Sequence, residues 1–564
     1  MTSSTRRDFL RAAALVPAGV AGFVGSSTAN QESTPTPGPA SGRARSTDVF
    51  DYVLAGAGHN SLICAAYLAR AGYRILVLEG RAMIGGGCKT AEFLLPGFKA
   101  DLCSSAHSVI ARSPILRDNE LGLQQYGYEL LFPDVVLHYP FLDGASMTVF
   151  RNDPERTAAT IARVSKKDAE TFIRMASERE RLKAMAPAEA AKTRSGLYFQ
   201  RLAALSGYAA AKEVWESRYM RAASLSGGRF FGIPGSDVGT GGQAFSMMDH
   251  MAGRPIPKGG SGMLTVALGR LIEAHKGVIL TGKPVARLII DSGRCKGVEC
   301  VDGTQFRAEK GVVSTIHVKQ LIDMAPRELW GDSLLDGVEL MQPELAMFQF
   351  HYALSEAPRY PLAANGTVSS CEASIMQFPQ SIFALNADDA HGELHLDDCA
   401  LQIVHHAVFD AGRVPPGQGL LKIEGVAPYQ LKEGPEHWDA IKDHVADTIV
   451  THYFKHTSNL SKDKILAQFL LSPLDIERMN PAMWCGSVHH FDNRWGNFAP
   501  YRLPIPGLYQ TGACTAPGGS ISGMPGRNTA SLILQDEGKT LQQAISAERG
   551  NSTAGIVKSR SDGL

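Results

Sequence analysis

A chain of 564 residues, of which 44% are hydrophobic and 20% charged, can bury a large core and is long enough for more than one domain. Lys and Arg together number 56, as do Asp and Glu, and this balance excludes the basic surface typical of nucleic-acid-binding proteins as well as an acidic tail. The nine cysteines are scattered and never spaced C-x-x-C, which argues against a disulfide framework and against a metal site.

Residues 1–29 are predicted to be an export signal and not part of the fold. The pair Arg6-Arg7 is followed by the apolar run 12–24 and then by Ser27-Thr28-Ala29, whose small side chains are typical of a cleavage site. The pattern resembles a twin-arginine (Tat) signal, so we expect export to the periplasm or the extracellular space. A basic amphipathic helix or a short uncleaved anchor is the alternative, but the run is shorter than the ~20 residues that span a bilayer. Residues 30–47, rich in Ser, Thr, Pro and Gly, are predicted to be a disordered linker.

A strand, a glycine turn, a helix and a second strand follow in the order of a βαβ unit. Residues 51–55 are predicted to be a short apolar strand, 62–71 an alanine-rich helix that Gly72 can end, and 73–78 a second strand. Between the first strand and the helix lie Gly56, Ala57, Gly58, His59, Asn60 and Ser61. This order predicts a Rossmann-type dinucleotide-binding unit.

The glycine turn and the acidic residue after the second strand have separate tasks in such a unit. Gly56 permits the tight turn, and Gly58 lets the backbone approach the pyrophosphate, whose charge meets the free N–H groups of the helix N-terminus. Glu79 lies about 20 residues further on, where a carboxylate binds the ribose hydroxyls and repels a 2′-phosphate. Ser61 replaces the third glycine of the fingerprint and is small enough for helix and strand to pack closely.

A second glycine-rich turn behind Glu79 favours FAD over NAD as the dinucleotide. Gly85, Gly86 and Gly87 follow Arg81 closely, so their backbone can run alongside an extended cofactor. The number of glycines alone would also allow a flexible loop.

These motifs, together with the C-terminal stretch 507–528, resemble those of the phytoene dehydrogenase-related FAD-dependent oxidoreductases. The residues that carry the resemblance are Gly56-Ala-Gly-His-Asn-Ser, Glu79-Gly-Arg, Gly85-Gly-Gly, Lys258-Gly-Gly-Ser-Gly-Met and Asp475-Ile-Glu-Arg-Met-Asn, in that order along the chain. The sequence is most similar to the branch of this family called pyridine nucleotide-disulphide oxidoreductase domain-containing protein 2, and the resemblance covers nearly the whole chain after the linker.

The resemblance implies an α/β fold with a Rossmann-type FAD-binding domain, as in amine oxidases and phytoene desaturases, and a discontinuous α+β substrate domain. The FAD-binding domain is expected to combine residues 48–123, 254–323 and 480–545. The substrate domain is expected at 124–253 and 324–479, followed by a C-terminal tail at 546–564.

The same resemblance implies which residues contact FAD. Val285 is expected at the adenine, Gly512 and Ala513 beside the pyrophosphate, and the segment 518–528 under the isoalloxazine, with Asn528 capping the helix that follows. The predicted cofactor-binding residues are Gly56, Ala57, Gly58, His59, Asn60, Glu79, Gly80, Arg81, Gly86, Gly87, Val285, Gly512, Ala513, Gly523, Met524 and Asn528.

Periodicity supports this division of the chain. Residues 263–275 have helical apolar spacing, and 278–280, 285–290 and 297–301 are predicted to be strands. In the substrate domain, 154–221 is predicted to be helical, and 344–354 and 399–426 are predicted to be strands, which together indicate a helical cap over a sheet. Six side chains are either the lining of an apolar tunnel or plain core: Phe348, Phe350, Tyr352, Met376, Phe378 and Phe383.

Catalytic side chains are less clearly marked, because the flavin itself performs the hydride chemistry. His489, His490 and Tyr501, with Trp495 nearby, precede the last FAD segment and are the candidates, although paired histidines also occur in solvated turns. The histidine usual in the family after the Gly-Ala turn is absent here, where the chain has Thr515. Cys514 is either a covalent flavin link or a small buried side chain.

Together these features predict an exported FAD-dependent dehydrogenase or desaturase that acts on an apolar small molecule of isoprenoid or aromatic type. Because soluble NAD(P) is scarce outside the cytoplasm, oxygen or a quinone is the expected electron acceptor. A flavin amine oxidase is one alternative, and a flavin-requiring isomerase or binding protein without redox activity is another. Peripheral contact with a membrane and the oligomeric state stay open.

Overall fold

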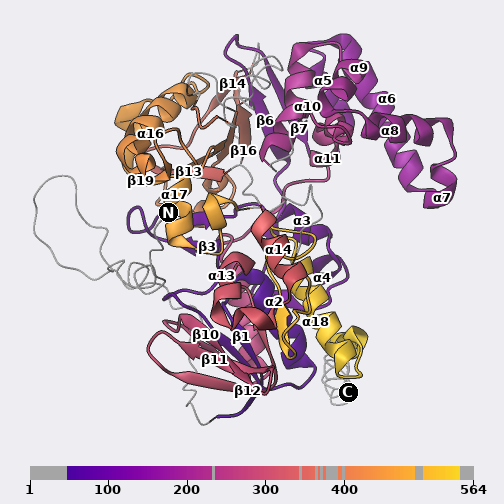
Figure 1. Ribbon diagram of the computed structural model, residues 1–564. Coiled ribbons are helices and arrows are strands. Elements are labelled where there is room, and N and C mark those ends of the chain that lie inside the picture. Colours follow the sequence, from indigo (N-terminus) through magenta and orange to yellow (C-terminus); the bar gives the residue numbers. More distant parts are fainter. Residues whose placement is uncertain are drawn as a thin grey trace, which may run out of the picture.

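Two seven-stranded sheets organise the protein, one in the lower and one in the upper half of Figure 1. The computed structural model describes residues 48–230, 235–341, 346–362, 366–368, 372–375, 391–394, 396, 400–488 and 499–546. The predicted export signal and linker therefore lie outside the described residues, as does all of the predicted tail beyond residue 546.

The lower sheet contains the predicted βαβ unit. Its strands are β1 (Phe50–Ala55), β2 (Ile75–Leu78), β9 (Val278–Leu280), β10 (Val285–Asp291), β11 (Arg294–Cys300), β12 (Gln305–Ser314) and β20 (Leu508–Gln510). The order is β10-β11-β12-β1-β2-β9, with β20 beside β12. Strand β1 is parallel to both neighbours, so that Leu54 lies opposite Val77 on one side and Val313 on the other. The apolar runs of the parallel strands β1 and β2 are buried, whereas β10, which pairs antiparallel with β11, is partly exposed.

Three helices from distant parts of the sequence pack together beside this sheet: α2 (His59–Arg70), α12 (Met263–Ala274) and α18 (Met524–Asp536). Figure 1 shows α18 beside α2. The helix predicted at 263–275 is thereby confirmed. Helix α18 lies close to α2 at Gly526, where a Cβ atom would lie 2.1 Å from the carbonyl oxygen of Asn60. Only a residue without a side chain allows this approach.

Helices α13 (Val318–Leu321) and α14 (Asp332–Leu340) also pack on the lower half of the molecule. Trp330, between them, is fully buried in the same apolar cluster as Phe306 and Leu508. In the structure, the chain therefore stays with the lower sheet beyond position 323, where the sequence placed a domain boundary.

The upper sheet gathers strands from the two predicted parts of the substrate domain. Its order is β19 (Ile465–Leu471), β13 (Ala346–Leu354), β18 (Gly419–Ala427), β17 (Leu401–Val404), β16 (Glu372–Ile375), β6 (Val135–Pro140) and β7 (Ser146–Phe150). All neighbours are antiparallel except β16 and β6, which are parallel.

One face of this sheet packs on helix α16 (Trp438–Phe454). Phe348, Phe350 and Tyr352 of β13 point to this face and form one apolar cluster with Trp438 and Tyr453 of the helix. These three aromatic side chains are therefore core residues and do not line a tunnel. The other three residues considered with them, Met376, Phe378 and Phe383, lie outside the described part of the chain.

The helical cap predicted over the sheet is present at the upper right of Figure 1. It comprises α5 (Pro154–Ile161), α6 (Lys166–Lys183), α7 (Pro187–Ala190), α8 (Arg194–Ala204), α9 (Gly207–Val214), α10 (Arg218–Phe230) and α11 (Ser246–His250). Ser165, Thr193 and Ser206 each accept a hydrogen bond from a backbone N–H of the first turn, which explains where α6, α8 and α9 begin.

Short elements connect these layers. The remaining ones are β3 (Cys88–Ala91), β4 (Ala100–Cys103), α3 (Ser108–Arg112), α4 (Pro114–Arg117), β5 (Leu130–Leu131), β8 (Ile256–Pro257), β14 (Tyr360–Leu362), β15 (Gly366–Val368) and α17 (Pro473–Met479), with nine 3₁₀ turns in the described ranges. Among the described helices, none is both long enough and apolar enough to cross a membrane.

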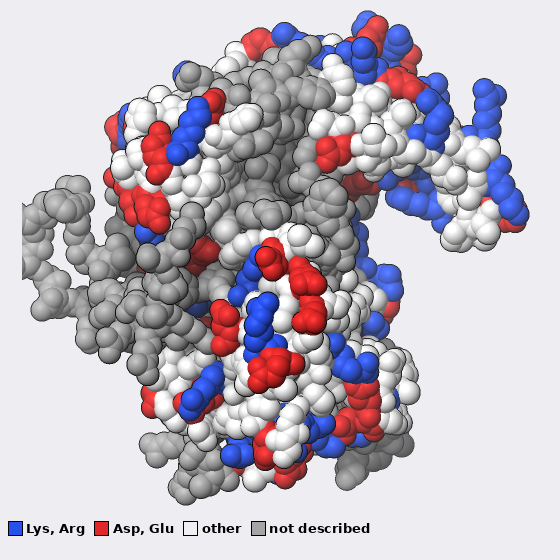
Figure 2. Space-filling model, viewed as in Figure 1, with Lys and Arg blue, Asp and Glu red and all other residues white. Residues whose placement is uncertain are grey.

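Charged side chains are mixed on the surface. Over the lower half of the face drawn in Figure 2, Lys and Arg alternate with Asp and Glu and form no large patch of one sign. This mixing agrees with the equal numbers of the two kinds of residue in the sequence.

The contact between α18 and α2 predicts the effect of a minimal substitution. Gly526→Ala places a methyl group against the Asn60 carbonyl and should lower the free energy of unfolding by about 2 kcal/mol, as overpacking does. Gly337→Ala in α14 is the matched control, since a Cβ there meets nothing within 4 Å, and it should be neutral or stabilising by about 0.5 kcal/mol. Equal midpoints of urea unfolding for the two variants would contradict this account.

Candidate functional site

A cavity of about 1860 Å³ lies between the two sheets. Its lower wall consists of the turn after β1, the residues after β2 and the second glycine turn. Its roof consists of side chains from the upper sheet, including those of β13, β18, β17 and β16. A ligand that fills the cavity would therefore contact both halves of the protein.

The glycine turn after β1 has the geometry that a dinucleotide requires. Gly56 has a φ of +102°, and a Cβ there would lie 2.1 Å from the Oγ1 atom of Thr315, so this position excludes a side chain. A Cβ on Gly58 would meet nothing within 4 Å, because this residue faces the open cavity. Gly58 is also the N-cap of α2 and offers no side chain to the first turn, whose N–H groups remain available to an anion.

Glu79 points into the crevice beside this turn. Its side chain is buried, with 7% of the residue exposed, and lines the cavity. The Oε2 atom accepts a hydrogen bond of 3.0 Å from the N–H of Ala57, and Oε1 accepts one of 3.0 Å from the N–H of Arg81. The carboxylate is thus held where a ribose would lie next to the pyrophosphate turn.

The second glycine turn packs directly on the first. The N–H of Gly85 donates a 2.8 Å hydrogen bond to the carbonyl of Ala57, and a Cβ on Gly86 would lie 3.2 Å from the Cα of Gly58. These contacts hold the turn in place, in contrast to the flexible loop considered from the sequence. Gly86 and Gly87 both face the cavity.

Most of the predicted cofactor-binding residues meet on the cavity wall. Those that line it are Gly56, Ala57, Gly58, His59, Asn60, Glu79, Gly80, Arg81, Gly86, Gly87, Val285, Gly512 and Ala513. Gly523, Met524 and Asn528 do not line it. They lie at the start of α18, although their neighbours Gly519, Ser520 and Ile521 reach the cavity.

The prediction that Asn528 caps a helix is wrong. Helix α18 begins at Met524, after Gly523 in a left-handed conformation, so Asn528 lies in its second turn. The Nδ2 atom of Asn528 donates a 2.9 Å hydrogen bond to the hydroxyl of Tyr501, which in turn donates to the carbonyl of Ala516. Tyr501, a catalytic candidate, therefore ties loops together and does not line the cavity.

The other catalytic candidates, His489, His490 and Trp495, lie outside the described residues. Cys514 is buried beside Val318 and Val338, away from the cavity lining, in agreement with the interpretation as a small buried side chain.

Buried polar groups in the crevice fit a dinucleotide. The buried Nε2 atom of His59 and the buried Oδ1 atom of Asn60 have no hydrogen-bond partner among the described residues, and both residues line the cavity. Lys89 also lines the cavity, and no described acidic side chain forms an ion pair with it. Burial lowers the pKa of Lys89, and the nearby charge of Glu79 opposes this only in part. A pyrophosphate would give these groups the partners that the described chain does not supply.

Lys89 was not among the residues predicted from the sequence. The available signal was a basic residue on the strand directly after the Gly85-Gly86-Gly87 turn, where the chain must pass beside the dinucleotide.

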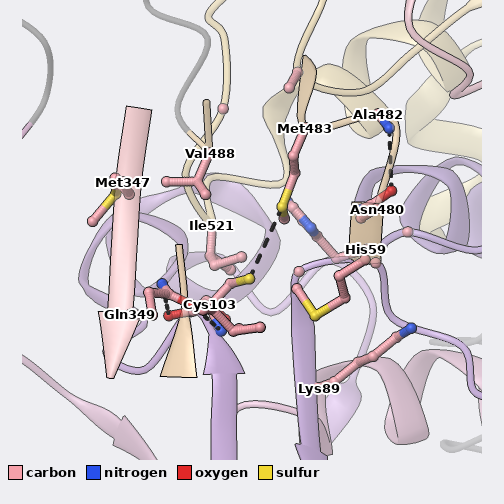
Figure 3. Close-up of a pocket in the computed structure, with 18 of the residues that line it drawn as sticks. His59, Lys89, Cys103, Met347, Gln349, Asn480, Ala482, Met483, Val488 and Ile521 are labelled. Carbon is pink, nitrogen blue, oxygen red and sulfur yellow. Dashed lines mark hydrogen bonds between the residues drawn. The ribbon is translucent and has the colours of Figure 1, made fainter. Parts of the chain in front are cut away.

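The middle of the cavity is apolar (Figure 3). Met347 of β13 and Met483, Val488 and Ile521 converge there with Cys103, whose Sγ atom lies 3.9 Å from the Sδ atom of Met483. Burial raises the pKa of the Cys103 thiol to about 12, so it is neutral at physiological pH. This segment can hold the apolar part of a ligand and exclude water.

The roof carries polar side chains in two rows across the upper sheet. Cross-strand pairing places Leu471, Gln349, Glu424, Gln402 and Ser374 in one row, and Phe469, His351, Lys422, Val404 and Glu372 in the next. Gln349 connects its row to β4, because its Oε1 atom accepts a 3.2 Å hydrogen bond from the N–H of Cys103. Its Nε2 atom donates a 2.9 Å hydrogen bond to Glu424 in the same row. Lys422 and Glu424 form an ion pair.

The sequence analysis missed these polar residues, although β13 carried a signal for them. Gln349 and His351 alternate with Phe348, Phe350 and Tyr352, as expected for a strand with one polar and one apolar face.

Comparisons with known proteins agree with this geometry. The model of the family described as flavin containing amine oxidoreductase matches residues 62–341. Pyridine nucleotide-disulfide oxidoreductase domain-containing protein 2 of Mus musculus is 24% identical, over 86% of this chain and 94% of its own length. A component chain of the limonene dehydrogenase of Castellaniella defragrans is 25% identical, over 86% of this chain and 95% of its own length.

A solved structure of a putrescine oxidase variant has the same fold. It superposes with a TM-score of 0.53 at 12% identity and covers 86% of this chain and 99% of its own. The predicted α/β fold with an FAD-binding unit is confirmed, and so is FAD as the cofactor.

The position of Glu79 predicts its contribution to FAD affinity. In Glu79→Gln, an amide N–H₂ faces the N–H of Ala57 or of Arg81, and the charge offered to the ribose is lost. Since a hydrogen bond to a charged group contributes about 1.5–3 kcal/mol, the Kd for FAD should rise by roughly tenfold or more. Glu309→Gln, at an exposed carboxylate paired with Arg74, is the control. An unchanged Kd in flavin fluorescence titrations of Glu79→Gln would contradict the assignment.

Proposed function

Because the chain is an FAD-dependent oxidoreductase related to the flavin-containing amine oxidoreductases, we propose that it dehydrogenates a C–H bond of a small molecule with a largely apolar body, of isoprenoid or aromatic type. The proposal rests on a change in the polarity of the cavity wall. Next to the polar groups of the dinucleotide crevice, the wall consists of the apolar side chains of Met347, Met483 and Ile521 (Figure 3). An apolar skeleton fits this segment.

Different residues of the chain have different roles in such a reaction. The turn at Gly56 and Gly58 binds the dinucleotide, and Glu79 orients its ribose. When bound, FAD supplies a hydride acceptor. Met347, Met483 and Ile521 would hold the apolar skeleton against it and exclude water, and the neutral Cys103 thiol leaves this segment uncharged. Substrate orientation thus comes from the roof and the apolar middle.

Amine oxidation is less well supported. The family model carries the name of amine oxidoreductases, but a cage for an amine needs aromatic rings that face one another. Among the described residues that line the cavity, the Tyr and Phe side chains are those of Tyr139 and Phe469. They come from β6 and β19, and four strands lie between these two in the sheet, so the two rings do not form a cage.

We also propose that the protein is exported and passes electrons to oxygen or a quinone. The support is the twin-arginine pair Arg6-Arg7 before an apolar run, since this export route carries folded proteins and so permits FAD to bind before transport. Outside the cytoplasm, soluble NAD(P) would be too scarce to accept the electrons.

The proposed reaction predicts a spectroscopic result. The purified protein should show flavin absorbance, and anaerobic addition of an isoprenoid or aromatic substrate should bleach it without NAD(P)H. The product should be lighter by two hydrogens, which distinguishes dehydrogenation of a C–H bond from oxidation at nitrogen. A folded protein that binds no flavin would exclude the proposed function, and bleaching only by amines would favour the alternative.

Export can be tested separately. The double variant Arg6→Lys/Arg7→Lys should keep the protein in the cytoplasm, because the lysines retain charge but remove the twin-arginine pair. Cell fractionation would show this, with Arg43→Lys/Arg45→Lys in the linker as the matched control. Normal export of the first variant would contradict the assignment.

A further inference from the structure

Arg254 brings a cation to the upper part of the cavity. It follows α11 and precedes β8, lines the cavity, and has a side chain that is 22% exposed. Its Nε atom forms an ion pair of 2.5 Å with the Oε2 atom of Glu372, whose side chain is 1% exposed. The guanidinium is therefore held from one side by a buried carboxylate on the roof.

The carboxylate of Glu372 is itself held firmly. Oε1 pairs with the Nε2 atom of His406 at 2.8 Å, and Oε2 accepts a 2.9 Å hydrogen bond from the Nε2 atom of Gln402. Burial acts to raise the pKa of Glu372, but Arg254 and His406 outweigh it and lower the pKa to about 2. Glu372 is thus ionised at physiological pH and fixes the orientation of Arg254.

The outer nitrogens of Arg254 are left for a ligand. Within the described part of the chain, Glu372 is the ion-pair partner of Arg254, and the terminal guanidinium nitrogens donate no hydrogen bond to a described residue. These nitrogens lie on the partly exposed, cavity-facing side chain. A guanidinium that is oriented in advance loses little entropy when it binds an acceptor oxygen.

The charges around Arg254 decide which kind of oxygen fits. Glu372 neutralises Arg254, and Glu424 neutralises Lys422 in the same sheet. His250, also in the lining, is uncharged at physiological pH, because burial and the charge of Arg254 lower its pKa to about 3. Arg112 also acts on His250, and His406 shares the carboxylate of Glu372 with Arg254. Because the carboxylates of Glu372 and Glu424 both line the cavity, they would repel a ligand carboxylate, whereas a neutral oxygen would gain charge-assisted hydrogen bonds.

We infer that the substrate is an oxygenated molecule whose hydroxyl or carbonyl group binds Arg254, while its apolar body lies against Met347 and Met483. Arg254 is then a specificity-determining residue, held in position by Glu372. The inference rests on the proposed function and narrows its substrate class, since a pure hydrocarbon would leave the outer nitrogens of Arg254 without a partner among the described residues. Leaving such groups unpaired in a filled cavity is a strong source of selection against the wrong ligand.

Binding of matched ligands tests this inference. The probes are an isoprenoid hydrocarbon, the primary alcohol and the carboxylic acid of the same skeleton, in ten-carbon and fifteen-carbon lengths. Calorimetric titration of the anaerobically reduced holoprotein measures affinity without turnover. The wild-type protein should bind the alcohol at least tenfold more tightly than the hydrocarbon, and the acid no more tightly than the alcohol.

Substitution of Arg254 should remove the preference. Arg254→Met should weaken binding of the alcohol by roughly 10-fold to 100-fold, the value of a hydrogen bond to a charged group, and change binding of the hydrocarbon by less than about twofold. Arg254→Lys keeps the charge but loses the planar guanidinium with its several N–H donors. Its affinity for the alcohol should therefore lie between those of the wild type and of Arg254→Met. Arg287→Met, at an exposed arginine paired with Glu299, is the control.

A second variant guards against misfolding. Arg254→Met leaves Glu372 buried beside an apolar side chain, so the double variant Arg254→Met/Glu372→Gln removes both charges and should show the same loss for the alcohol. Equal affinities for alcohol and hydrocarbon in the wild type, equal losses for both in the variants, tighter binding of the acid, or no binding of any probe would each overturn the inference. A folded protein that cannot be loaded with FAD would instead overturn the proposed function.

Discussion

The contact between two glycine turns underlies the rest of the structure. The N–H of Gly85 bonds to the carbonyl of Ala57, and Gly86 approaches the Cα of Gly58 so closely that a Cβ would lie 3.2 Å from it. The first turn forms the dinucleotide crevice, and the second leads directly into β3, which carries Lys89 to the cavity wall. Strand β4, paired with β3, brings Cys103 to the apolar middle. One backbone contact thus relates the cofactor crevice to the apolar middle of the cavity.

A buried ion pair connects the floor of the cavity to the segment that leads into the upper sheet. The Oδ2 atom of Asp101 on β4 lies 2.9 Å from the Nη2 atom of Arg413, and both side chains are buried. The Oδ1 atom of Asp101 accepts hydrogen bonds from the N–H of Ser261 at 2.9 Å and from the hydroxyl of Thr90 at 2.6 Å. Such a pair is stabilising only when its remaining polar atoms are satisfied, and the Oδ1 atom of Asp101 meets this condition. The network joins β3 and β4 to Ser261 and to the segment that precedes β18.

One face of the upper sheet is apolar and the other is polar, and the polar face forms the roof of the cavity. One face packs Phe348, Phe350 and Tyr352 on α16 and provides stability. The other face presents Gln349 and Glu372 among other polar groups to the cavity, where their burial is compensated by mutual hydrogen bonds. A roof of this kind accepts a ligand with a polar end more readily than a uniformly apolar one, while the apolar middle below it suits a hydrocarbon body.

The dinucleotide-binding unit could be predicted from the sequence, because its strands, helix, glycines and Glu79 lie within one short stretch whose spacing reflects backbone geometry. The helices and strands with clear periodicity were predicted for the same reason. The start of α18 was misplaced, since Asn528 resembles a cap in sequence but Gly523 provides the turn. The polar roof could not be predicted from the sequence, because the three strands β13, β18 and β17 must pair before Gln349, Glu424 and Gln402 form a row. The sequence alone thus determined that the chain binds a dinucleotide. Only the tertiary structure decided which side chains form the rest of the cavity wall, because that wall is built from strands that are far apart in the chain.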